Sequence, residues 1–128
     1  MSSEAERFYD EFPVRMRRVA REAPEVPHAF GGLLQSVMQD GALTAREKQL
    51  IALGIGMAVR CLPCIDAHVE KALAAGATRK QVLEAAGVAV MMQGGPTYTY
   101  MPYVIEALDA VEARNEPVEI QEYAHADT

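Results

Sequence analysis

The chain has 128 residues, enough for one modest hydrophobic core, so a single domain is expected. Half of the residues are hydrophobic and 23% are charged, a globular composition that excludes a wholly disordered chain. The formal net charge of -6 provides no general attraction to phosphate backbones or anionic lipids. Neither nucleic acid nor a membrane surface is therefore an expected partner.

The start of the chain and its cysteine content bear on the cellular compartment. Residues 1–6 carry neither the basic segment nor the apolar segment of a secretion signal. The longest apolar stretch, residues 50–59, is far shorter than a bilayer span. We therefore expect a cytoplasmic protein. Its two cysteines, Cys61 and Cys64, then belong to no secreted disulfide framework, and their CxxC spacing is that of a redox or metal site.

The first half of the chain predicts two helices. Apolar residues at helical intervals over residues 8–20 predict a helix that lies on the core and is bent or begun at Pro13. A second apolar stripe, over residues 26–38, predicts a helix that ends before Gly41.

A capping box predicts the start of a third helix. Thr44 and Glu47 have the spacing at which a hydroxyl and a carboxylate satisfy free backbone amides reciprocally. The helix should run over residues 47–60. Because its apolar residues lie on nearly all sides, we expect it to be the buried central helix.

Three further helices follow in the second half. Pro63 suits the first turn of a helix that ends at Gly76. Thr78 and Gln81 repeat the capping signature and begin a fifth helix, which residues 94–96 break. A last helical pattern begins after Pro102 and fades near Asn115.

These elements predict an all-α, single-domain bundle of about six helices, because no stretch alternates with the period of a strand. The helical domain should span residues 1–115, and residues 116–128 should form an acidic C-terminal tail. The third helix is apolar on nearly all sides, and a chain of this length has few other residues to cover it. We therefore expect a homo-oligomer.

The residues that point to chemistry cluster at the start of the fourth helix. At 100° per residue, Cys61, Cys64 and His68 fall within one 60° wedge. A helix start lowers the pKa of a thiol, and an imidazole one turn away can accept its proton. If one sulfur is oxidised to a sulfenic acid, the other can condense with it into a disulfide. The pattern therefore favours dithiol redox chemistry.

Two structural alternatives remain open. The cysteines could be buried packing residues, since free cysteine is among the most buried residue types. They could also bind zinc, which would need at least one further ligand, and His28 and His125 are the other histidines. No metal and no tightly bound cofactor is expected on the leading interpretation.

Several nearby residues have both a structural and a functional interpretation. Glu47 is expected to serve the helix cap, although it is also a candidate proton relay. Gln49 lies on the inward side of the third helix and is expected to face the cysteines. Asp66 and Glu70 are expected on a solvated face. Met91 and its neighbour Met92 are expected to fill the core.

Three stretches give the chain a family resemblance: residues 45–53, residues 61–68 with the CxxC and His68, and residues 74–78. Over residues 25–112 the chain resembles the carboxymuconolactone decarboxylase and alkylhydroperoxidase D-like superfamily. Residues 91–96 are similar to the glycine-rich turn of its short, single-domain members.

The resemblance implies an all-helical subunit that forms trimers or hexamers and a thiol-dependent peroxidase or disulfide reductase. It assigns Cys64 as the peroxidatic cysteine, Cys61 as the resolving cysteine and His68 as the proton relay. The relay glutamate of the family falls at Gln49, whose amide cannot transfer a proton at neutral pH. Some members carry a histidine where this chain has Pro63.

The expected substrate is a small hydroperoxide or a disulfide, and the expected reductant is an external dithiol or a thioredoxin-like protein. The alternative is a non-catalytic helical oligomer that uses the CxxC as a redox sensor or a ligand clamp, which Gln49 favours. A lyase of the carboxymuconolactone decarboxylase type is a third interpretation, ranked lower because that activity belongs to members without CxxC.

Overall fold

A computed structural model describes residues 2–115 of the chain. They form six long helices and the one-turn helix α6, with no strand among them. The helices are α1 (Glu4–Glu22), α2 (Glu25–Met38), α3 (Ala45–Ala58), α4 (Leu62–Ala74), α5 (Arg79–Gln93), α6 (Gly95–Tyr98) and α7 (Met101–Asn115). The all-α expectation is confirmed. The expected tail, residues 116–128, lies outside the described residues.

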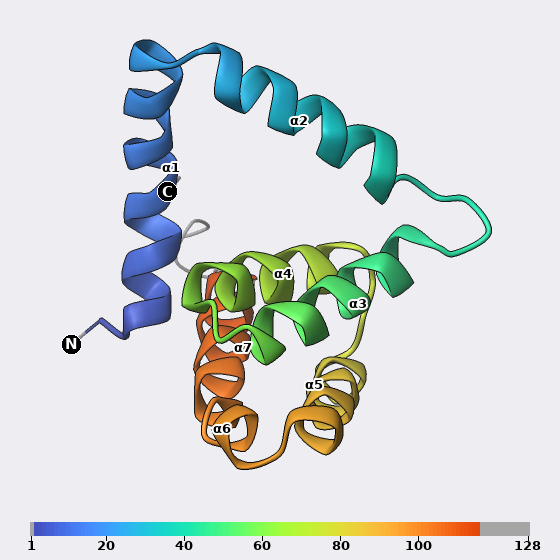
Figure 1. The fold of residues 1–128 in the computed structure, drawn as a ribbon. Helices are drawn as coiled ribbons and strands as arrows, with labels where there is room; N and C mark the ends of the chain where they lie inside the picture. Colours follow the sequence, from blue (N-terminus) through green and yellow to red (C-terminus); the bar gives the residue numbers. More distant parts are fainter. Residues whose placement is uncertain (1, 116–128) are drawn as a thin grey trace, which may run out of the picture.

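The core lies where α3, α4, α5 and α7 pack together (Figure 1). Its largest fully buried side chains come from these four helices and α6: Leu53, Met57, Ile65, Val69, Val82, Val104, Leu108 and Thr97. We call these four helices, with α6, the packed unit. None of the described helices combines the length and the apolar composition needed to span a membrane.

The first two helices form an arm that projects from the packed unit (Figure 1). Helix α1 touches the packed unit through its first half, where Ala5 and Tyr9 are buried. Its second half carries apolar side chains that remain more than one-third exposed, among them Val14 and Met16. Helix α2 buries none of its residues. The expectation that the first helix lies on the core thus holds for its first half and not for its second half.

The capping residues predicted from the sequence start their helices as expected. Thr44 and Glu47 form a complete capping box at α3, and Thr78 and Gln81 form one at α5. Helix α1 begins earlier than predicted, because the Ser3 hydroxyl accepts a hydrogen bond from the Glu6 amide. The helix then continues through Pro13 without a break in its assignment.

The turn between α3 and α4 is built on a left-handed residue. Arg60 has a φ of 56°, a region that non-glycine residues rarely occupy. The amide of Cys61 donates to the carbonyl of Gly56, and the amide of Arg60 donates to that of Met57. These bonds satisfy the last carbonyls of α3 as in a Schellman motif. The turn ends α3 two residues before the predicted end and places Cys61 at the start of α4.

Candidate redox site

The two cysteines are joined by a disulfide at the beginning of α4, with their Cα atoms 5.2 Å apart. Cys61 is the N-cap residue, and its sulfur accepts a hydrogen bond from the backbone amide of Cys64 at 3.2 Å. Pro63 occupies the first turn, where a missing amide breaks no helical hydrogen bond. Both sulfurs therefore lie at the positive end of the helix dipole, which stabilises a thiolate once the disulfide is reduced.

Helix α3 approaches the dithiol closely because it carries a glycine there. A Cβ atom on Gly56 would lie 2.9 Å from the Cβ of Cys64. That distance is too short for two carbon atoms that are not bonded to each other. Only glycine allows this approach, so Gly56 determines how deeply the cysteines sit against α3.

His68 lies one helical turn after Cys64 and is held by α3. Its Nδ1 atom lies 2.7 Å from Oε1 of Gln49. Because an amide oxygen can only accept, Nδ1 carries the proton and Nε2 has a free lone pair. Partial burial and the nearby charge of Lys71 lower the pKa of His68. The imidazole is therefore neutral at pH 7 and can act as a base through Nε2.

The structure separates the two candidates for the relay position. Gln49 contacts His68. Glu47 lies exposed at the start of α3, where its carboxylate accepts a hydrogen bond from the Thr44 amide. Hydrogen bonds from Thr44 lower the pKa of Glu47. Glu47 thus has the capping role expected of it.

Asp66 lies in an environment that the sequence did not predict. It was expected on a solvated face, but it is partly buried where α1 crosses α4. Burial, together with the charges of Glu106 and Glu4, raises the pKa of Asp66 to about 7. Tyr9 donates a hydrogen bond to the Asp66 carbonyl at 2.6 Å. The spacing of Asp66 and Glu70 could not reveal that α1 covers this face.

In the part of the chain that the structure describes, no third zinc ligand lies near the two cysteines. No group of three or more histidine, cysteine, aspartate or glutamate side chains among residues 2–115 is arranged to hold a metal ion. His125 lies outside the described residues.

The chain belongs to the carboxymuconolactone decarboxylase family, whose model matches residues 24–113. Two curated relatives are uncharacterized proteins. One, from the cox locus of Paracoccus denitrificans, is 37% identical over 93 residues, which are 73% of this chain and 84% of the relative. The other, from Cupriavidus necator, is 34% identical over 90 residues, which are 70% of this chain and 80% of the relative.

Two crystal structures share the fold. A carboxymuconolactone decarboxylase family protein from Legionella pneumophila superposes with a TM-score of 0.77 at 34% identity, covering 88% of this chain and 97% of that one. A family member from Thermotoga maritima, described with a suggested part in an antioxidative response, has a TM-score of 0.67 at 24% identity. That match covers 85% of this chain and 90% of the other. The expected family and fold are confirmed.

Proposed function

We propose that this protein is a thiol-disulfide oxidoreductase that reduces a small hydroperoxide or a disulfide through Cys61 and Cys64. The observation that carries the proposal is the Cys61–Cys64 disulfide at a helix start, one turn from a histidine with a free Nε2. Membership of a family with CxxC-containing members supports it. The reaction needs no bound cofactor, because the two sulfurs themselves carry the electrons.

The reduced enzyme would begin with its two thiols. His68 accepts the proton of Cys64, and the thiolate attacks the terminal oxygen of the hydroperoxide. The O–O bond breaks, the alkoxide takes the proton back from His68, and Cys64 is left as a sulfenic acid. The Cys61 thiol then attacks that sulfur, which releases water and forms the disulfide.

An external reductant would close the cycle. A dithiol or a thioredoxin-like protein gives two electrons and two protons to the disulfide and becomes a disulfide itself. With a disulfide as the substrate in place of a hydroperoxide, Cys64 would form a mixed disulfide that Cys61 resolves. In both cases the same two sulfurs gain and lose one pair of electrons.

The order of the two cysteines can be tested by trapping the first oxidised sulfur. In the Cys61→Ser variant treated with mild peroxide, we expect a sulfenic acid at Cys64, detected by mass spectrometry. The Cys64→Ser variant is the matched control and should react more slowly, because Cys61 lies farther along the helix from His68. If Cys64→Ser reacts as fast as the wild type and Cys61→Ser is inert, Cys61 attacks first.

Gln49 favours a second function, a non-catalytic redox sensor. Its amide holds His68 but cannot exchange a proton with it. A sensor forms the disulfide without steady turnover. The Gln49→Glu variant separates the two functions: a carboxylate at this position makes His68 a stronger base, so peroxide turnover should rise. A melting curve of the variant must accompany the assay, because a buried carboxylate without partners destabilises the fold.

The Glu47→Gln variant is the matched control for that experiment. Loss of turnover in Glu47→Gln, with no change in Gln49→Glu, would make Glu47 the relay acid. If neither variant differs from a wild type that shows no turnover with any dithiol, the sensor function replaces the enzymatic one.

A further inference from the structure

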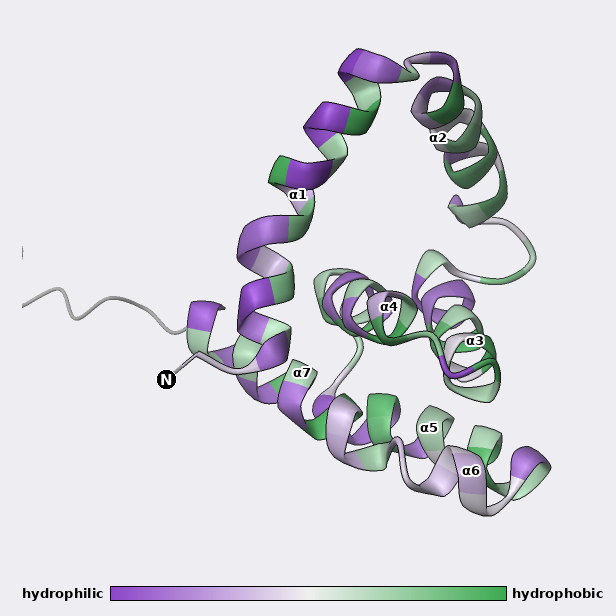
Figure 2. Cartoon of the chain, turned by 60° about the vertical axis from the view of Figure 1, so that its left-hand side comes forward, coloured by the Kyte–Doolittle hydropathy of each residue, from purple (hydrophilic) through white to green (hydrophobic). Residues whose placement is uncertain are grey.

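One face of α2 is apolar and is largely left uncovered by the rest of its own chain. Four side chains at helical spacing form this face, and each is more than half exposed: Val26, Phe30, Leu33 and Val37. We call them the α2 stripe. Figure 2 shows α2 with much hydrophobic surface and standing apart from most of the packed unit. Exposing such a stripe to water is unfavourable, so we expect another apolar surface to cover it.

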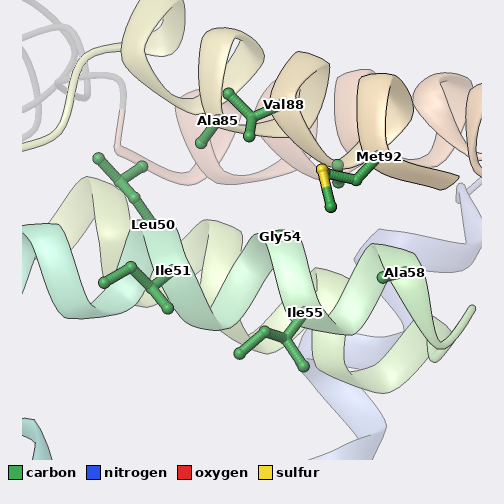
Figure 3. A pocket seen from close by; sticks show the side chains of 9 residues that line it. Leu50, Ile51, Gly54, Ile55, Ala58, Ala85, Val88 and Met92 are labelled. Atoms are coloured by element: carbon green, nitrogen blue, oxygen red, sulfur yellow. The ribbon is translucent and has the colours of Figure 1, made fainter.

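A second unpartnered apolar surface lies between α3 and α5. There a groove of about 410 Å³ is lined by apolar residues (Figure 3). Ile51 and Ile55 form its α3 edge, Val88 and Met92 form its α5 edge, and small residues such as Gly54 lie between the edges. Each of the four edge side chains is half exposed or more. We call this surface the α3–α5 groove.

We propose that the α2 stripe of one copy of this chain packs into the α3–α5 groove of a second copy. The apolar residues of the stripe follow one another at intervals of three or four residues, which keeps them on one side of the helix. On each edge of the groove the two side chains are four residues apart, so the row of side chains on α2 can lie between the two edges. Neither surface includes a charged side chain. Each copy supplies one stripe and one groove, so a closed assembly leaves none uncovered.

The α2 helix of the same chain does not line this groove. The ammonium group of Lys48, in α3, donates to the carbonyls of Val37 and Gln39 at 2.8 and 2.7 Å. These bonds hold the C-terminal end of α2 beside the first turns of α3. The α2 of a second copy is bonded to its own α3 and not to this one, so it is free to reach the groove from outside.

The exposed area suits a stable interface. The four side chains of the stripe expose roughly 400 Å², and the four at the groove edges expose about as much. A two-fold pair that makes the contact twice buries on the order of 1,600 Å², the size of a standard stable protein interface.

The contact would also cover the side of α3 next to the dithiol. At 100° per residue, Ile55 and Val59 lie between the groove face of α3 and Gly56, which touches Cys64. Both side chains are exposed in the single chain. A helix from a second copy over them restricts the approach of solvent to the cysteines from that side.

Crosslinking between differently marked copies tests the contact directly. Leu33→Cys is placed in one copy and Ile55→Cys in another, both on a Cys61→Ser, Cys64→Ser background, and the two chains are co-expressed. A short bis-maleimide should then join one copy of each kind. The matched control replaces Leu33→Cys by Gln35→Cys, on the opposite face of α2, and should give little product. Because the background lacks the dithiol, the result is independent of the proposed redox function.

Sedimentation provides the second measurement. Phe30→Asp and Ile55→Asp should each convert the assembly to monomers at micromolar concentration, with helical content unchanged because both side chains are exposed in the single chain. Gln35→Asp should leave the assembly intact. The proposal is overturned if the wild type is monomeric, if it assembles but gives no Leu33–Ile55 product, or if the Gln35 control crosslinks equally. A monomer whose stripe binds lipid vesicles or another protein would identify a different occupant.

Discussion

Helices α2 and α4 have similar lengths, 14 and 13 residues, and both are rich in apolar side chains. Helix α4 buries Ile65, Val69 and Ala72, whereas α2 buries no residue at all. The difference lies in their neighbours, because α4 packs against both α3 and α7 and α2 has only light contacts with α1 and α3. Apolar content therefore marks a helix that must be covered, and the tertiary arrangement decides whether the same chain covers it.

The packed unit should be the region where substitutions affect chemistry most. Replacing His68 by Gln removes the base while keeping a side chain of similar reach. We expect the reaction of the reduced protein with peroxide to slow by about 10²-fold, the usual cost of losing general-base assistance. The measurement is the pH dependence of thiol oxidation by stopped flow. An unchanged pH–rate profile would assign His68 a purely structural role.

A smaller effect on stability should come from the close approach of α3 and α4. In Gly56→Ala the new methyl group meets the Cβ of Cys64 at 2.9 Å, so a helix must shift. Overpacking of this kind costs about 1–3 kcal/mol of unfolding free energy. Gly87→Ala, also within a helix, is the matched control, because nothing would lie within 4 Å of its new methyl group. Urea denaturation of both variants checks this, and equal stabilities would show that the dithiol has room to move away from α3.

The contact between the arm and the packed unit should depend on pH. The raised pKa of Asp66, about 7 against an unfolded value of 3.8, means that the folded protein binds more protons than the unfolded chain in that interval. Stability therefore falls as the pH rises from about 4 to about 7. The Asp66→Asn variant should remove this fall and be more stable than the wild type at pH 8 by about 1 kcal/mol, a value reduced for partial exposure to solvent.

Thermal unfolding at about pH 4 and about pH 8 measures this contribution. The two proteins should differ little at the lower pH, where the carboxyl group is protonated in the folded state. A variant that is less stable than the wild type at the higher pH would contradict the account of this carboxyl group.

The sequence predicted best what depends on neighbours within one turn. The two capping boxes and the glycine at position 76, with its φ of 97°, follow from local spacing. The sequence predicted less well what depends on distant packing. Periodicity identified the apolar stripe of α2 but could not show that nothing in the chain covers it. Met91 and Met92 were expected in the core, yet both are more than two-thirds exposed.

In the candidate redox site, too, local features could be predicted from the sequence and tertiary contacts could not. The wedge formed by Cys61, Cys64 and His68 could be derived from helical angles, whereas the approach of Gly56 required the packing of α3 on α4. The partial burial of Asp66 also depends on tertiary packing, because Tyr9 of α1, which contacts it, is more than fifty residues away in the chain. Local rules thus predicted the reactive groups, and tertiary contacts set their environment.

Steady-state turnover tests the central claim most directly. The reduced wild-type protein is mixed with a small hydroperoxide and excess dithiothreitol, and peroxide consumption is followed beside the Cys61→Ser, Cys64→Ser double variant. We predict saturable consumption that continues for many cycles and requires both cysteines. Consumption at the rate of the double variant, with either a hydroperoxide or a disulfide as the oxidant, would contradict the assignment of this protein as a dithiol oxidoreductase.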